Sequence, residues 1–392
     1  MKIAIVQPNE HSIICRRTDL LSTCTSITDE VEVIPLFEKR KAKQSVMSSL
    51  RGLMSLVRAR PDVIYYMGLT WIVPQLIRLL IPHKTVITYD AGNVEKGIAQ
   101  TLGKSFPMVC FVALLERLFV TGSDIVVVRG ISFPDYFRHR YGGLQAQFFY
   151  VPDPLDARVN PSAKKREQLE IFTIAYVSSY FMIRVAKDLV PRGWELVDAI
   201  AVLRKIFKTD VRVDFLGTGA GLVSLKKRAH DAGVADLCTF SGRITRDALL
   251  EHLASADLGF MEDYDSLGYR YSVGHKVQEY MNVGLPVMTG NSPEKMHLLE
   301  GQNQQPLLFD PPVLNSKAQV TSYIENLAHI LHYATLHRDT IFSAGIRNIE
   351  HGRHIFHEGV VSKLMEDVYQ AIVVRLSLKR GNLPQEEVEA IA

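Results

Sequence analysis

Short apolar runs rich in Val and Ile alternate with longer segments of helical periodicity along the first 156 residues of the chain. The runs that predict strands are residues 2–7, 31–36, 62–68, 84–93, 123–130 and 148–156. Apolar runs of this length, separated by helical segments, are typical of parallel strands that are covered on both faces. The pattern therefore predicts a doubly wound, Rossmann-like α/β domain.

The same alternation begins again after a polar and charged stretch at 160–170, which we interpret as a linker. The second set of predicted strands is 172–179, 211–216, 237–242, 257–262 and 285–290, again with helical segments in between. We predict an N-terminal domain over 1–160, a second Rossmann-like domain over 170–342, and a C-terminal helical tail over 343–392. Two such domains in tandem would face each other across a cleft lined by the carboxyl ends of their strands.

Composition excludes several classes of protein. The chain has 392 residues, of which 47% are hydrophobic and 22% charged, and its formal net charge of +3 is too small to indicate a nucleic-acid partner. The four cysteines form no CxxC motif, which favours free thiols in a reducing compartment over a disulfide frame or a zinc site. The first residues predict a strand and not a signal peptide, and the longest apolar stretch, 106–115, is too short to span a bilayer. We therefore expect a cytoplasmic protein.

One segment of the first half is strongly basic. Against a single acid, residues 38–60 contain Lys39, Arg40, Lys41, Lys43, Arg51, Arg58 and Arg60. Apolar side chains recur in it at helical spacing, at Leu50, Leu53, Met54 and Val57. A basic amphipathic helix can lie on an anionic membrane surface at the inner face of the membrane. The alternative is an ordinary helix with its basic residues in water, and in both cases we expect the apolar stripe to be core.

The segment "GHKVQEYMNVGLPV", residues 274–287, combines a glycine, a cation and a carboxylate at the start of a predicted helix. Lys276 and Glu279 are three residues apart and share a helix face, while Gly284 and Pro286 predict the end of the helix. A helix N-terminus beside a cation is suited to an anion. The alternative interpretation is an ordinary ion pair on a solvated helix face.

The second half, from "VDFLGTGAG" through "SGRIT" and "ADLGF" to "HKVQEYMNVGLPV", resembles the donor-binding domain of GT-B glycosyltransferases, specifically family 4 (group 1). The resemblance implies that Glu279 contacts the ribose hydroxyls of a nucleotide-sugar. It also implies that backbone amides between Ser272 and His275, Gly274 included, meet phosphate or sugar, with Lys276 as a partner at the same helix start.

Further residues take their expected roles from the same resemblance. "KDLVPRGWELV", residues 187–197, is similar to a family element whose two cations neutralise the donor diphosphate, which implies this role for Lys187 and Arg192. Gly219 in "GTGAG" is expected to allow close backbone approach to the nucleotide, and Arg243 in "SGRIT" to lie where the family meets the base.

Two features separate the chain from the common family pattern. Where the family often has a second Glu, eight residues before Glu279, this chain has Tyr271. Where the family often offers a His after the fourth strand, "TYDAGN" offers Asp90, which we expect to orient a hydroxyl or to cap the next helix. "DYD", with Asp263 and Asp265, imitates a metal-binding Asp-x-Asp motif, but in GT-B context we interpret it as a polar loop and expect no metal and no cofactor.

The resemblance implies a retaining glycosyltransferase that moves a sugar from a nucleotide-diphospho-sugar to a glycan or lipid-linked acceptor. Two alternatives remain open: a nucleotide-sugar epimerase, which shares the architecture, and a GT-B protein that binds a nucleotide-sugar or a partner without turnover. The base, sugar, acceptor and linkage are not specified by the sequence.

Overall fold

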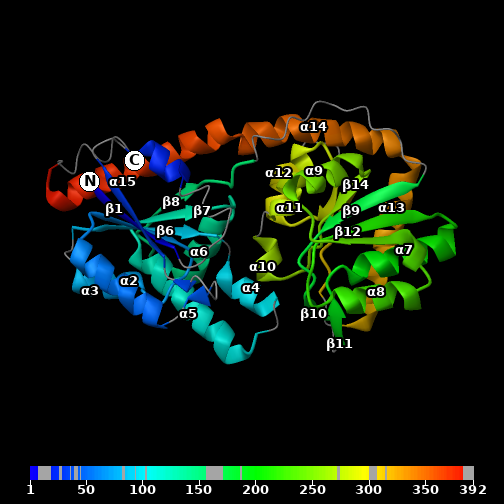
Figure 1. Cartoon of the computed structure of the whole chain (residues 1–392), viewed down its shortest axis with the longest axis horizontal. Coiled ribbons are helices and arrows are strands. Elements are labelled where there is room, and N and C mark those ends of the chain that lie inside the picture. The colour runs from blue at the N-terminus through cyan, green and yellow to red at the C-terminus, as the bar shows by residue number, and fades with distance from the viewer. Residues whose placement is uncertain are drawn as a thin grey trace. The chain divides into compact units, whose positions relative to one another are not determined.

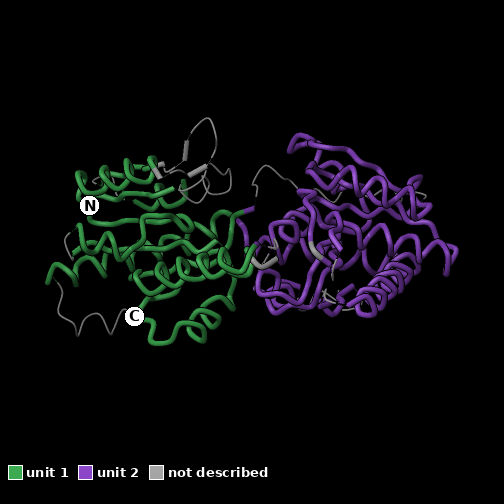
Figure 2. Tube along the Cα trace, turned by 90° about the horizontal axis from the view of Figure 1, so that it is seen from below, with its two compact units in different colours: residues 1–99, 105–154, 358–392 green, residues 100–104, 155–357 purple. Residues whose placement is uncertain are grey.

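The computed structural model describes residues 1–7, 19–25, 29–35, 37–38, 43–44, 46–81, 84–92, 94–101, 104–155, 171–185, 188–271, 274–299, 307–313 and 316–382. The chain divides into two compact units (Figure 2). Unit 1 comprises Met1–Ala99, Ser105–Pro154 and Glu358–Ala392, and unit 2 comprises Gln100–Lys104 and Leu155–His357.

The core of unit 1 is a six-stranded parallel sheet of order β2-β1-β5-β6-β7-β8 (Figure 1). Its strands are β1 (Lys2–Gln7), β2 (Glu30–Pro35), β5 (Val63–Met67), β6 (Val86–Ala91), β7 (Ile125–Val128) and β8 (Gln147–Tyr150). Every residue of β5, β6 and β7 is buried, as expected for strands covered on both faces. A separate pair, β3 (Phe37–Glu38) and β4 (Lys43–Gln44), is antiparallel.

The helices that follow these strands are α2 (Val46–Ala59), α3 (Pro74–Leu80), α4 (Glu95–Thr101), α5 (Phe106–Gly122) and α6 (Phe133–Tyr141). The last helix of the chain, α15 (Glu358–Arg380), also packs on this sheet, because Val361, Met365 and Ile372 belong to the same buried cluster as the strands. Near its end, Lys379 Nζ lies 2.8 Å from Asp124 Oδ2, and this bond ties α15 to the start of β7.

Helix α2 presents a different face to the sheet from the one we predicted. Its buried positions include Ser49, Gly52 and Leu56, whereas Leu50, Met54 and Val57 are exposed. The prediction that the Leu/Met/Val stripe is core is therefore wrong. The buried face carries the small residues Ser49 and Gly52 beside Leu56, and the larger apolar side chains of the helix point outward. Residues 39–42 of the basic segment lie outside the described residues.

Unit 2 repeats the architecture with a six-stranded parallel sheet of order β13-β12-β9-β14-β15-β16. Its strands are β9 (Phe172–Val177), β12 (Val211–Leu216), β13 (Cys238–Gly242), β14 (Leu258–Phe260), β15 (Val287–Gly290) and β16 (Leu308–Phe309). An antiparallel pair, β10 (Met182–Val185) and β11 (Asp188–Pro191), follows β9. The helices are α7 (Trp194–Phe207), α8 (Leu222–Asp231), α9 (Arg246–Ser255), α10 (Leu267–Arg270), α11 (His275–Asn282), α12 (Pro293–Leu299), α13 (Lys317–Leu336) and α14 (Arg338–Phe356).

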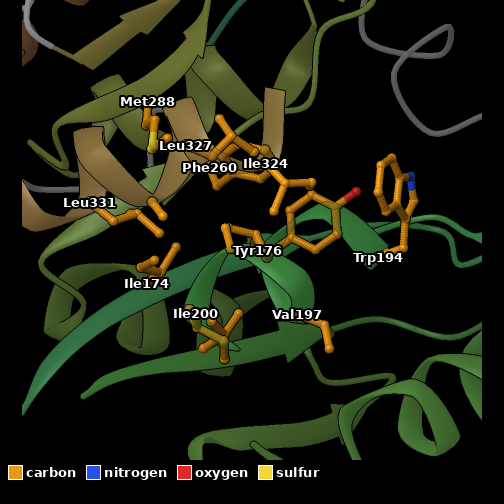
Figure 3. Packing of buried hydrophobic residues seen from close by; sticks show 14 of the residues in the cluster. Ile174, Tyr176, Trp194, Val197, Ile200, Phe260, Met288, Ile324, Leu327 and Leu331 are labelled. Carbon is orange, nitrogen blue, oxygen red and sulfur yellow. The ribbon is translucent and has the colours of Figure 1, made fainter. Parts of the chain in front are cut away.

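Helices α7 and α13 pack together on one face of this second sheet (Figure 3). Side chains of Ile174 and Tyr176 from β9 meet Ile200 of α7 and Leu327 of α13 in one continuous buried cluster. The two α/β units with parallel sheets confirm the predicted fold class. The described part of the predicted tail, residues 343–382, is helical, and its two helices divide between the units, with α14 in unit 2 and α15 in unit 1.

Candidate functional site

A buried carboxylate and two cations form an ionic cluster where β14 of unit 2 ends. Glu262 lies two residues after β14 and its side chain has no exposed surface. Its Oε1 pairs with the guanidinium of Arg192, and its Oε2 accepts a hydrogen bond from Lys276 Nζ at 2.7 Å. The hydroxyl of Tyr269 lies 3.4 Å from Oε1. The carboxyl ends of parallel strands are the usual ligand edge of an α/β sheet, so the cluster lies where a binding site is expected.

Aromatic faces support both cations of this cluster. Arg192 lies between β11 and α7, its backbone N–H donates to Phe181 O at 2.9 Å, and its guanidinium lies 4.8 Å from the centre of the Phe181 ring. Lys276 stands in the first turn of α11, with its ammonium 4.5 Å from the centre of the Tyr176 ring. Cation–π attraction adds to the ion pairs and fixes the direction of both side chains.

The start of α11 depends on a glycine. Gly274 has φ +71°, and a Cβ built there would lie 2.5 Å from the Met261 sulfur, so this position accepts only glycine without rearrangement. The helix ends before Gly284, which also has positive φ, as predicted. Gly274 thus brings Lys276 to the ionic cluster by allowing the turn that precedes it.

Glu262 contacts both cations, the buried carboxyl of Glu195 on α7 lies near them as well, and both cations retain some contact with solvent. The side chains of Arg192 and Lys276 are 16% and 15% exposed, whereas Glu262 is 0% exposed. Burial lowers the pKa of the Lys276 ammonium well below its usual value, and the nearby guanidinium of Arg192 lowers it further. An incoming anion would offset both the burial of the ammonium and its repulsion by Arg192. The arrangement is therefore suited to a phosphate or a diphosphate.

Glu279 has a partner of its own. Its carboxylate pairs with the guanidinium of Arg246, in the first turn of α9, and both side chains are partly exposed. Lys276, in contrast, pairs with Glu262. The interpretation of Lys276 and Glu279 as an ordinary ion pair on a solvated helix face is therefore wrong, since each residue belongs to a different contact.

The glycines of the "GTGAG" turn have a structural reason in the fold itself. A Cβ at Gly217, where φ is +128°, would lie 2.0 Å from Ser178 O, and a Cβ at Gly219 would lie 2.1 Å from Tyr180 O. The close backbone approach at these positions is thus made with the loop after β9. Arg243, at the end of β13, is exposed. The remaining two predicted site residues, Lys187 and Ser272, lie outside the described residues.

The two carboxylates of "DYD" are both paired with bases. Asp263 is fully buried with Lys295, whose Nζ lies 3.3 Å from Oδ2 and donates to Tyr269 O at 2.6 Å. Asp265 pairs with Arg270 at 2.8 Å and is partly exposed. The segment is a loop, as predicted, and Asp263 is its buried end while Asp265 is exposed. In the described ranges, no three His, Cys, Asp or Glu residues are grouped as a metal ion requires.

Unit 1 has its own polar cluster at the corresponding edge of its sheet. Asp90, the predicted site residue, is buried at the end of β6, and its Oδ2 accepts a hydrogen bond from the Tyr65 hydroxyl at 3.2 Å. At the end of β7, Arg129 lies 3.3 Å from Asp153 Oδ2. A Cβ at Gly92 would lie 3.5 Å from the Arg129 guanidinium carbon, so this guanidinium lies against the loop that follows β6.

Two glutamates complete the cluster of unit 1. Glu116 of α5 is buried, accepts hydrogen bonds from the hydroxyls of Tyr141 at 2.5 Å and Tyr136 at 3.2 Å, and its pKa is raised by burial. Glu95, at the first position of α4, has a pKa of about 7, raised by burial and then by the carboxylate of Glu116, with Arg129 acting in the opposite direction. This cluster is rich in carboxylates and is suited to accept hydrogen bonds from hydroxyl groups.

Sequence reasoning missed several of these residues. Glu262, Arg129 and Asp153 all stand within three residues of the end of a strand, at the end of an apolar run that predicted it. A charge at the carboxyl end of a parallel strand is the signal that could have identified them. Glu116 was detectable as the one acid in a mostly apolar helical stretch.

The family comparison matches the second half of the chain. Residues 194–330 match the model of the family described as Glycosyl transferases group 1. A GDP-mannose-dependent alpha-(1-6)-phosphatidylinositol monomannoside mannosyltransferase of Mycobacterium tuberculosis is 32% identical over 197 residues. The matched residues are 44% of this chain and 45% of that relative, so the similarity spans less than half of its length.

Solved structures match nearly the whole chain. HepE of Anabaena in complex with UDP is 15% identical with a TM-score of 0.64, over 95% of this chain and 99% of that one. WaaG, a glycosyltransferase involved in lipopolysaccharide biosynthesis, is 15% identical with a TM-score of 0.63, also over 95% and 99%. These likenesses confirm the GT-B fold, and the family match confirms the resemblance of the second half to group 1 glycosyltransferases.

Proposed function

We propose that the chain is a retaining glycosyltransferase that takes a sugar from a nucleotide-diphospho-sugar bound by unit 2. The observation that carries the proposal is the pair of cations, Arg192 and Lys276, at the carboxyl end of the sheet in the half that matches the family model. Two partly exposed cations beside a helix start are the groups that a leaving diphosphate needs.

In the proposed reaction the bond between the anomeric carbon and the diphosphate breaks while the acceptor oxygen attacks from the same face. Negative charge grows on the leaving oxygen, and Arg192, Lys276 and the first backbone amides of α11 stabilise it. The leaving diphosphate takes the proton of the acceptor hydroxyl. Lys187 and the amides near Ser272 and Gly274 belong to the same proposal through the family resemblance.

Glu279 is proposed to hold the nucleotide by its ribose hydroxyls. A carboxylate accepts two hydrogen bonds from vicinal hydroxyls, and its ion pair with Arg246 holds the side chain in place. Gly219 and Arg243 are proposed to lie next to the nucleotide on the loops after β12 and β13, at the same carboxyl edge of the sheet.

Unit 1 is proposed to bind the acceptor, a glycan or a lipid-linked sugar, with Asp90 orienting a hydroxyl. Support comes from the carboxylate-rich edge of its sheet and from the name of the mannosyltransferase relative, whose acceptor is a phosphatidylinositol mannoside. An enzyme with such an acceptor would work at a membrane surface.

The exposed apolar stripe of α2 supports this location. Met47, Leu50, Met54 and Val57 are 58%, 48%, 51% and 36% exposed, recur along one side of the helix, and are accompanied by exposed arginines at 51 and 58. A helix with this arrangement is suited to lie in the plane of an anionic membrane. Among the helices that the structure describes, none combines the length and the hydropathy needed to cross a bilayer.

A binding and turnover panel tests the function. The purified chain is heated with UDP-, GDP- and ADP-sugars, and the sugar that binds raises the melting temperature by mass action. The same donor is then incubated with glycan and lipid-linked acceptors, and products are identified by mass spectrometry and NMR. Transfer with retained anomeric configuration supports the proposal, an epimerised donor identifies an epimerase, and binding without any product identifies a non-catalytic binder.

A further inference from the structure

The carboxylate of Glu262 lies between the two cations that we assign to the donor diphosphate. It pairs with the guanidinium of Arg192 through one oxygen and accepts a hydrogen bond from Lys276 Nζ at 2.7 Å through the other. Two like charges this close repel each other strongly in a buried site, and an opposite charge between them removes that repulsion. Glu262 follows an interior strand of the sheet, so its place is fixed by the backbone ladder of unit 2.

We propose that Glu262 is a positioning residue of the donor site, which holds Arg192 and Lys276 side by side as two charges directed at the same diphosphate. The proposal rests on the proposed function for the identity of the ligand. Because Glu262 has no exposed surface and each cation is about one-sixth exposed, it acts through the cations and not by touching the donor. Nothing in the motifs of the second half pointed to this residue.

The charge of Lys276 depends on the groups around it. The charged and titratable groups that face it are Glu262 after β14, Arg192 and Glu195 beside α7, Glu279 on its own helix, and Tyr176 of β9. Burial and Arg192 lower the pKa of Lys276, whereas the carboxylates of Glu195 and Glu279 raise it. Glu262 makes the closest of the carboxylate contacts, so its removal lowers this pKa further and the ammonium loses its proton at a lower pH.

The test measures binding of inorganic pyrophosphate and of UDP to the full chain by calorimetry at pH 6 and pH 8. Glu262→Gln should raise the dissociation constant about tenfold at pH 8 and clearly less at pH 6, relative to the unchanged chain at the same pH. The ratio of the two dissociation constants, variant over unchanged chain at the same pH, cancels the effect of the ligand's own titration. Glu262→Asp, which keeps the charge at shorter reach, should recover most of the affinity at pH 8.

A second background shows whether Glu262 acts through Lys276. In chains that already carry Lys276→Met, Glu262→Gln should no longer make binding depend on pH, because no ammonium is left to titrate. Asp265→Asn, which removes an exposed carboxylate of the same loop, is the matched control and should bind as the unchanged chain does.

Several outcomes would overturn the proposal. A folded Glu262→Gln chain that binds pyrophosphate as tightly as the unchanged chain, or more weakly by the same factor at both pH values, removes Glu262 from this role. Should Glu262→Gln fail to melt cooperatively, Glu262→Asp decides: a loss of about twofold or more at pH 8 that shrinks at pH 6 supports the proposal, and no change refutes it. If the unchanged chain binds neither pyrophosphate nor UDP nor any other donor, the proposed function fails instead, so the two failures are distinguishable.

Discussion

The two units carry polar clusters of opposite character at the same edge of the same kind of sheet. In unit 2 the cations Arg192 and Lys276 both contact the carboxylate of Glu262. In unit 1 carboxyl groups predominate: Arg129 pairs with Asp153 and acts on the carboxyl of Glu95. The carboxyl groups of Glu95, Glu116 and Asp90 all lie near Tyr89. The architecture fixes where strand ends present side chains, and the residues at those ends decide which sign of charge is offered.

The difference teaches how one fold can offer two kinds of site. A surplus of buried positive charge favours an anion such as a diphosphate, whereas a surplus of carboxyl groups favours hydroxyls, which donate hydrogen bonds. In both clusters burial disfavours the charged form of a side chain. It lowers the pKa of Lys276 in one and raises the pKa of Glu95 to about 7 in the other. The comparison predicts that charge removal weakens binding in unit 2 and stabilises the fold in unit 1.

The largest effect is expected at Arg192. Arg192→Ala should lower kcat by at least about a hundredfold, because it removes a cation that stabilises charge on the leaving diphosphate in the transition state. Arg192→Lys should recover part of the rate, since the point charge returns without the planar fork. Steady-state kinetics with the identified donor measures both.

A chelator is the control for this prediction. Added chelator should change neither the unchanged chain nor the variants, because no metal carries the diphosphate charge in the proposed mechanism. If Arg192→Ala has almost no effect and chelation abolishes activity, the proposed mechanism is contradicted. Asp263 and Asp265 would then be the candidates for binding the diphosphate through a metal.

In unit 1, Glu95→Gln should stabilise the protein at high pH. The folded-state pKa of Glu95, about 7, lies above the ordinary value of 4.5, so the folded state binds the extra proton and stability falls as pH rises from about 4.5 through 7. Gln has no charge to desolvate, and the gain should be about 2 kcal/mol at pH 8 and close to zero near pH 4. Urea unfolding at the two pH values measures it.

The exposed Asp135→Asn on α6 is the matched control for Glu95 and should change stability by less than about 0.5 kcal/mol at either pH. An equal gain for Glu95→Gln at both pH values would show that burial of its charge is not the cause.

Glu279→Gln should have an intermediate effect, confined to donor binding. The hydrogen bonds to the ribose hydroxyls become neutral, and we expect a loss of about 1–2 kcal/mol in affinity with an unchanged melting temperature. Calorimetric titration with the preferred nucleoside diphosphate measures it. Unchanged affinity in an intact fold would remove Glu279 from the site.

The smallest effect is expected at the surface of unit 1. Replacing the exposed Met54 and Leu50 of α2 by Gln should reduce sedimentation with vesicles rich in acidic lipid, without loss of stability, because neither side chain is in the core. Binding of the unchanged chain should weaken as salt rises, owing to the basic residues beside the stripe. The exposed Ile206 of α7, changed to Gln in unit 2, is the control. No sedimentation of the unchanged chain would leave the stripe without this role.

Much of this molecule could be predicted from its pattern of apolar runs. Both parallel sheets and the helix stop at Gly284 follow from hydrophobic periodicity and from glycine and proline positions, which are local properties of the chain. The GT-B architecture followed from the resemblance of the second half to a known family. The outward orientation of the apolar stripe of α2 could not be predicted, because the same stripe can pack on a sheet or lie on a membrane. Only the structure shows that Ser49, Gly52 and Leu56 form the buried face of the helix.

The sequence by itself determined the elements, their order, and the family-like positions of Arg192, Lys276 and Glu279. Only the tertiary structure decided how those charges are paired: Lys276 with Glu262 from 14 residues away, and Glu279 with Arg246 from 33 residues away. The reason is physical. Local spacing controls which residues share a helix face, but burial of a charge requires a counter-charge, and here that partner comes from another element of the fold.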